Sequence, residues 1–196
     1  MALGGYLIAI GILAFFMSFS IGANDAANAL ATSYGSNALR LLYLVILGAV
    51  FEFIGAYFCS GHVAGTLVPK IISGIEDQDQ ETQEQMMLSS SIASFILIMS
   101  SSILGMPISG THTVVGALIG SGLAVLGSAA VNWTKLTVIV ASWFVAPLLS
   151  IILCSVFFMA VCSFTLNKQN SFAARTLCLT LITAVAFALI AVMLIK

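Results

Sequence analysis

The chain has 196 residues, of which 61% are hydrophobic and only 7% are charged. Soluble domains carry about 25% charged residues, so this composition excludes an ordinary soluble domain and indicates an integral membrane protein. The formal net charge is −1, and no basic cluster predicts binding to nucleic acid or to anionic lipid.

The apolar runs are about 18 residues or longer, enough for helices that cross roughly 30 Å of hydrocarbon. β-Barrel strands would instead show short apolar and polar alternation. We therefore predict an all-α, multi-pass transmembrane bundle that forms a single domain over residues 1–196. The first run lacks a positively charged start and a cleavage site, so we expect it to be retained in the membrane.

The first membrane helix is predicted over residues 3–31, with a break near Gly22. From position 22 to position 32 the sequence places an acid, two amides and a hydroxyl at the end of an uncharged run. Ionisable groups inside a membrane segment cost at least about 2.5 kcal/mol at the bilayer centre, so they usually line a cavity or a pathway.

Helical spacing would put Asn24, Asn28 and Thr32 on one face, with Asp25 adjoining Asn28. Their oxygens are hard ligands that suit sodium, so we predict a cation site here, with Asp25 and Asn24 as metal ligands. The alternative is that Asp25 only caps a helix that begins at Ala26.

A second run, 41–58, contains one acid, Glu52, in the middle of the span. The alternative to a functional role is a protonated carboxyl group that packs against a neighbouring helix. Residues 61–75 are predicted to form a helix that turns out of the membrane, so that residues 1–75 hold the broken helix and the helix with Glu52.

Residues 76–85 are predicted to form a polar acidic loop, and residues 86–196 contain the remaining spans. The span at 86–104 is rich in serine, which we interpret as close helix packing rather than a substrate path. Two further spans are predicted at 136–166 and 177–195.

A second polar motif begins at Pro107, which together with Gly110 interrupts any helix. Ser109 and Thr111 can cap the helix that resumes, and such a helix end attracts anions, so 107–131 is a candidate re-entrant hairpin. The alternative is a capped turn in which the neighbouring His112 is only a local hydrogen-bonding group.

The membrane spans contain no lysine or arginine that could balance Asp25 and Glu52. The counter-charge must therefore be a proton or a bound metal cation. A cation site beside an anion site predicts a cation-coupled anion symporter, because the cation offsets the repulsion between the anion and the carboxylates. No pair of nucleophile and base, metal-ligand cluster or nucleotide-binding loop predicts an enzyme, and no cofactor beyond the coupling ion is expected.

Three motifs resemble those of the inorganic phosphate transporter (PiT) family. Residues 22–29, GANDAANA, resemble its GANDVANA signature, and residues 107–116, PISGTHTVVG, resemble its PISGTHxxVG motif. Residues 51–56, FEFIGA, look like its FETxGA segment.

The resemblance implies a phosphate symporter driven by sodium or protons and built from two inverted repeats, with the substrate near the midplane. It implies that phosphate is bound by Ser109, Gly110, Thr111, His112 and Asn28. It also implies a cation or coupling role for Asp25, Asn24 and Glu52, to which the helical spacing above adds Thr32. The PISGTH spelling looks like that of eukaryotic members, so a plasma membrane is expected.

The second GANDVANA motif and second hairpin of the family do not occur in this sequence. The chain therefore resembles one repeat, and the expected partner is a second repeat or an oppositely oriented second copy. The alternatives are a membrane subunit that does not itself transport, and a symporter of another oxyanion such as sulfate.

Overall fold

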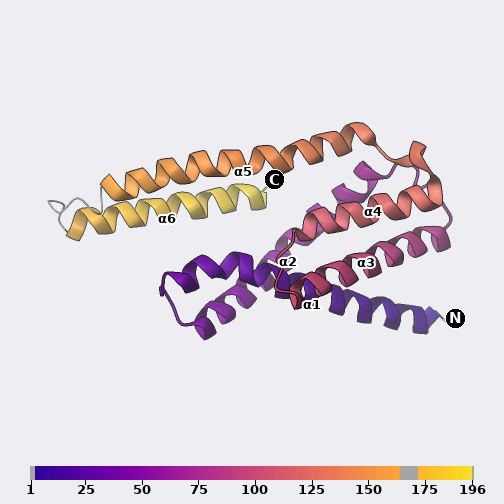
Figure 1. The fold of residues 1–196 in the computed structure, drawn as a ribbon, viewed down its shortest axis with the longest axis horizontal. Helices are drawn as coiled ribbons and strands as arrows, with labels where there is room; N and C mark the ends of the chain where they lie inside the picture. The colour runs from indigo at the N-terminus through magenta and orange to yellow at the C-terminus, as the bar shows by residue number, and fades with distance from the viewer. Residues whose placement is uncertain (1–2, 164–171, 196) are drawn as a thin grey trace. The chain divides into compact units, whose positions relative to one another are not determined.

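The computed structural model describes residues 3–163 and 172–195, which are almost entirely helical (Figure 1). The elements in these ranges are α1 (Leu3–Gly35), α2 (Leu41–Ile71), α3 (Gln80–Ile103), α4 (Gly110–Leu126), the 3-10 helix η1 (Ser128–Ala130), α5 (Trp133–Val161) and α6 (Phe172–Ile195). The predicted all-α class is confirmed. The chain divides into two compact units, residues 1–135 and 136–196, which are described separately below.

Four helices in the described part of the chain are long and apolar enough to cross a membrane. The spans lie at Ile8–Gly35, Leu41–Phe58, Gln80–Ile103 and Trp133–Val161. The chain is therefore a multi-pass integral membrane protein, as predicted.

Helix α1 runs without interruption through Gly22, which corrects the predicted break at this residue. A single glycine costs a helix only about 1 kcal/mol, and no proline accompanies it. The predicted break relied on glycine as a helix breaker next to polar side chains. In the structure, Asn24 instead reaches sideways to another segment, so the helix has no need to open.

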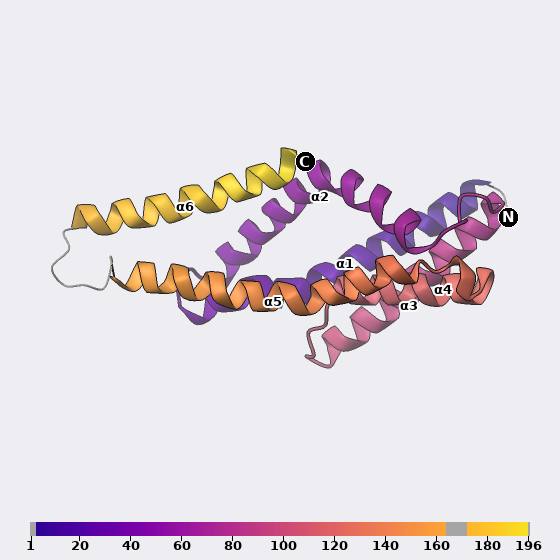
Figure 2. The ribbon, with the colours of Figure 1, turned by 90° about the horizontal axis from the view of Figure 1, so that it is seen from above.

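The predicted run 41–58 and the predicted helix 61–75 form one helix, α2, which ends at Ile71, and Figure 2 shows that it changes direction within its length. Helix α3 begins at Gln80, because the Asp79 carboxylate accepts hydrogen bonds from the Thr82 backbone N–H (3.1 Å) and hydroxyl (2.7 Å). The polar loop between the two helices is therefore shorter than the segment 76–85.

In the first unit, α3 and α4 form a hairpin that packs on α1 mainly through α3 (Figure 1). Ile98 of α3 and Val115 of α4 are almost completely buried. Ser90 and Ser94 are buried beside them, and the Ser94 hydroxyl donates to the Ser90 carbonyl oxygen at 2.7 Å. Small side chains that satisfy their own hydroxyls let helices approach closely, which supports the packing interpretation of this serine-rich helix.

A short bridge joins the two loops at the far end of this hairpin. Ile72 and Val131 form an isolated antiparallel β-bridge, in which the Ser73 N–H donates to the Ala130 carbonyl oxygen at 2.7 Å. The Ile72 side chain is 1% exposed and lies directly against Gly122 of α4. The absence of a side chain at Gly122 therefore makes room for the bridge.

The second unit contains most of α5 and all of α6. Pro147 lies inside α5 without ending it, and α5 has no buried residue in this unit. Leu148, Ile151 and Phe158 are among its exposed apolar side chains. A helix that is apolar on all sides is suited to contact with lipid or with other membrane helices.

Gly122→Ala is expected to be less stable than Gly120→Ala by about 1–3 kcal/mol, the usual cost of overpacking. A Cβ at Gly122 would lie 2.5 Å from Cδ1 and 3.3 Å from Cγ1 of the buried Ile72, whereas a Cβ at Gly120 has nothing within 4 Å. Both substitutions gain the same helix propensity, so the difference isolates the clash. Thermal unfolding in detergent measures it, and equal melting temperatures would contradict the prediction.

The cap at Asp79 predicts a pH dependence of stability. The hydrogen bonds from Thr82 lower the pKa of Asp79 below its ordinary value of 3.8. The ionised cap therefore stabilises the fold above about pH 3.8, and this contribution is lost as the pH falls through the lowered pKa. The melting temperature of the unsubstituted chain should exceed that of Asp79→Asn at neutral pH, and the gap should close in strong acid. A gap that is independent of pH would contradict the assignment.

Candidate functional site

The connector between α3 and α4, residues 104–109, is held in a defined conformation at both ends. Gly105 adopts a left-handed conformation (φ +68°), and the Met106 N–H donates to the Ser101 carbonyl oxygen at 2.9 Å. Ser109 is the N-cap of α4, because its hydroxyl oxygen accepts from the His112 N–H at 3.3 Å. The predicted cap at Ser109 is therefore present, and α4 begins at Gly110.

Asn24 of α1 binds this connector through its side-chain amide. Its Nδ2 donates to the Ile108 carbonyl oxygen (2.5 Å) and its Oδ1 accepts from the Ile108 N–H (3.2 Å). The Ser102 hydroxyl oxygen lies 3.5 Å from the same Oδ1, and its hydrogen goes to the Ile98 carbonyl oxygen at 2.9 Å. Asn24 is 3% exposed, so these bonds satisfy a polar group that would otherwise be costly to bury.

Asp25, the next residue, lies beside the beginning of α4. Its Oδ1 accepts from Asn24 Nδ2 at 3.3 Å, and its Oδ2 lies 4.0 Å from the position that a Cβ on Gly110 would take. Asp25, Gly110 and Thr111 line one cavity of about 200 Å³ together with Ile21, Val114, Val115 and Leu118. The structure thus brings the acid of the first motif to the helix end of the second.

The other predicted cation ligands lie apart from this cavity. Asn28 and Thr32 are exposed, and Glu52 is exposed on α2. None of the three lines the cavity that holds Asp25. The shared helix face of Asn24, Asn28 and Thr32 is therefore real, but only Asn24 meets the connector.

The residues predicted to bind phosphate at the start of α4 do not all point to the same side of the helix. Gly110 and Thr111 line the cavity with Asp25, whereas His112 lines a different one, of about 350 Å³, with Thr113, Ala93 and Leu97. Successive residues of a helix point about 100° apart, so one helical turn divides the motif between two sides of α4.

Two participants were missing from the sequence interpretation. Ser102 was included in the serine-rich packing segment, although its hydroxyl oxygen lies 3.5 Å from Asn24 Oδ1. Ile108 takes part only through its backbone, which no side-chain pattern can indicate. The available signal was the neighbouring Pro107, since a proline after a helix marks a connector whose backbone groups need other partners.

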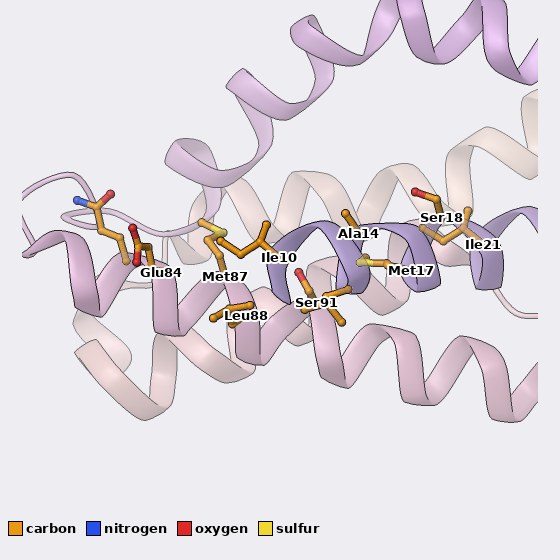
Figure 3. A pocket seen from close by; sticks show the side chains of 11 residues that line it. Ile10, Ala14, Met17, Ser18, Ile21, Glu84, Met87, Leu88 and Ser91 are labelled. Atoms are coloured by element: carbon orange, nitrogen blue, oxygen red, sulfur yellow. The ribbon is translucent and has the colours of Figure 1, made fainter. Parts of the chain in front are cut away.

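A larger cavity, of about 550 Å³, lies between α1 and α3 (Figure 3). Ile10, Ala14 and Met17 of α1 face Met87 and Leu88 of α3, with Glu84 near one end (Figure 3). Its walls are mainly apolar, and it contains neither Asp25 nor the start of α4. We therefore place the candidate site at the smaller cavity, where polar groups converge.

The fold and this site define a helical membrane protein in which an acid on one helix, α1, lies beside the N-terminus of another, α4. The sequence profile of the Phosphate transporter family matches residues 21–195. The chain belongs to the phosphate transporter family, which confirms the predicted resemblance.

Named relatives agree with this assignment. The chain is 38% identical to "Sodium-dependent phosphate transporter 1" of Mus musculus over 81% of this chain and 24% of that protein. It is 36% identical to the "Sodium-dependent phosphate transporter" of Plasmodium falciparum over 85% of this chain and 25% of that protein. These relatives are named as transporters and not as enzymes, as the sequence predicted.

A solved structure has the same fold. The chain superimposes on "The sodium-dependent phosphate transporter" with a TM-score of 0.81 and 35% identity, over 87% of this chain and 42% of that chain. The chain spans between 24% and 41% of the length of curated relatives such as these. The match therefore concerns one part of those proteins.

Ser109→Ala is expected to destabilise the start of α4 by about 1 kcal/mol, because the His112 N–H loses its cap. Hydrogen–deuterium exchange of the first amides of α4 should become faster. Ser121→Ala is the matched control, since the Ser121 hydroxyl only returns to the Leu118 carbonyl oxygen of the same helix. Equal exchange rates in the two variants would contradict the role of the cap.

Proposed function

We propose that this chain is one repeat of a symporter that carries inorganic phosphate across a membrane together with sodium. The observation that carries the proposal is the cavity shared by Asp25 of α1 and the N-terminus of α4. The sodium-dependent phosphate transporters among the relatives and the solved structure support the choice of ions.

The start of α4 has the chemistry of an anion site. The first backbone N–H groups of a helix have no partner within the helix, and the helix dipole places about +0.5 of an elementary charge there. Gly110 lacks a side chain that would keep an anion away, and Thr111 adds a hydroxyl group. Ser109 serves this site as the cap of α4. In our proposal His112 also binds phosphate, although it lines a different cavity from Gly110 and Thr111.

Asp25 makes a cation necessary in such a site. Two unit negative charges about 4 Å apart repel each other by about 4 kcal/mol at an effective dielectric constant of about 20. Residues 3–35 and 80–126 contain no lysine or arginine that could compensate. A sodium ion on the Asp25 carboxylate would remove the repulsion, which gives a physical reason for obligatory coupling between the two ions.

The exposed polar residues favour a partner for this repeat. Asn28, Thr32 and Glu52 lie in membrane-spanning helices, where contact with lipid is unfavourable. A second repeat, or an oppositely oriented second copy, would cover them and could bring them to the ions. Glu52 and Asn28 then keep their proposed roles in coupling and phosphate binding, in a site completed by the partner.

Radiolabelled phosphate uptake into proteoliposomes tests the function. We expect uptake that needs an inward sodium gradient, that stops when potassium replaces sodium, and that Asp25→Asn abolishes. Asp77→Asn, which changes an exposed acid in the loop before α3, is the matched control and should leave uptake unchanged.

The chain should be measured alone and together with a carboxyl-terminal repeat of the family. Uptake only in the second case would assign the chain to a partner-requiring half. Undiminished uptake in Asp25→Asn would contradict the proposed cation site. Competition by unlabelled sulfate that equals competition by phosphate would favour the other oxyanion.

A further inference from the structure

The side chain of Asn24 is held within the protein through both its nitrogen and its oxygen. An asparagine amide offers two donors and two acceptor positions. The donors bind the Ile108 carbonyl oxygen and Asp25 Oδ1, and the oxygen accepts from the Ile108 N–H. Reversing the amide would place oxygen against the Ile108 carbonyl oxygen, so these bonds also fix its orientation.

The contact with Ile108 resembles the pairing of two peptide groups. One amide side chain binds both the N–H and the carbonyl oxygen of a single connector residue. Asp25 follows Asn24 directly, and Gly110 follows Ile108 after one intervening residue. Fixing Asn24 on Ile108 therefore fixes the distance between the Asp25 carboxylate and the start of α4.

We propose that Asn24 is a positioning residue, which holds the α3–α4 connector on α1 and thereby sets Asp25 against the N-terminus of α4, and that it is not a ligand of the coupling ion. This inference rests on the proposed function for its consequences in transport. It replaces the sequence-based hypothesis in which Asn24 shares the sodium ion with Asp25.

Substitution by aspartate separates the two roles. As a ligand, a carboxylate at this position would bind sodium at least as well as an amide, since carboxylate oxygens are good ligands for hard cations. If the residue instead positions the connector, the ionised carboxylate fails, because it cannot donate to the Ile108 carbonyl oxygen and it adds a negative charge beside Asp25. Asn24→Asp should therefore behave like Asn24→Ala.

The rate of cross-linking between α1 and the connector measures how well Asn24 holds the two together, without a transport assay. Ala27 and Met106 line a cavity of about 100 Å³ where the connector meets α1. With the four native cysteines replaced by alanine, Ala27→Cys and Met106→Cys are joined by a short bis-maleimide. We expect Asn24→Asp and Asn24→Ala to slow the cross-linking by about tenfold, corresponding to one to two net hydrogen bonds.

Ser102→Ala should slow the cross-linking less, and Ser100→Ala, on the exposed side of α3, should leave it unchanged. Cross-linking in Asn24→Asp at the unsubstituted rate would overturn the proposal. Circular dichroism and detergent gel filtration establish that each variant is folded before it is compared.

Phosphate uptake is then measured for the same variants in proteoliposomes that also contain the carboxyl-terminal repeat. We expect Asn24→Asp to lower the uptake rate at saturating sodium by about tenfold or more. Retained uptake with a lower half-saturating sodium concentration would identify Asn24 as a ligand and overturn the proposal. If the unsubstituted chain does not transport phosphate, the proposed function fails, and the cross-linking result alone decides whether Asn24 positions the connector.

Discussion

The amide pairing between Asn24 and Ile108 is the contact on which the arrangement of the first unit depends. It joins the middle of α1 to the turn of the α3–α4 hairpin, two segments 84 positions apart in the chain. The hairpin packs along α1 through apolar and serine side chains, which allow many similar positions of one helix against the other. A directional, buried pair of hydrogen bonds selects one of these positions, because any other would leave the amide unsatisfied.

This constraint explains how a helix with polar residues stays continuous inside a membrane. The backbone of α1 keeps its own hydrogen bonds, and the polar side chains find partners beside the helix. Among the described residues, the Asp25 carboxylate receives one side-chain hydrogen bond, from Asn24 Nδ2 at 3.3 Å, and it lies half-buried at a cavity. Asn24 thus bonds to the connector, whereas Asp25 lines the cavity beside it.

The sequence predicted the helical class and the cap at Ser109, because these follow from composition and local spacing. It also predicted a cation site at Asp25 beside an anion site at the helix end, but it did not predict the contact with the backbone of Ile108 that brings the two together, because that contact has no signature in the sequence. Helical spacing grouped Asn24 with Asn28 and Thr32, but spacing fixes only the face of a helix. Which residue on that face meets the connector depends on how far α3 extends before it ends at Ile103.

The distribution of exposed groups bears on what completes the site. Exposed leucine, isoleucine and phenylalanine side chains on α2 and α5 are suited to lipid, but Glu52 on α2 and Asn28 on α1 are not. Each would lose hydration in hydrocarbon without a partner, so these two positions mark the parts of α1 and α2 that should face protein or a water-filled cavity. Asp25 and α4 supply one carboxylate and one helix end, whereas a phosphate ion has oxygens on all sides. A second set of donors, brought by the covering partner, would allow the ion to be enclosed, and Glu52 and Asn28 would lie at the surface where that partner binds.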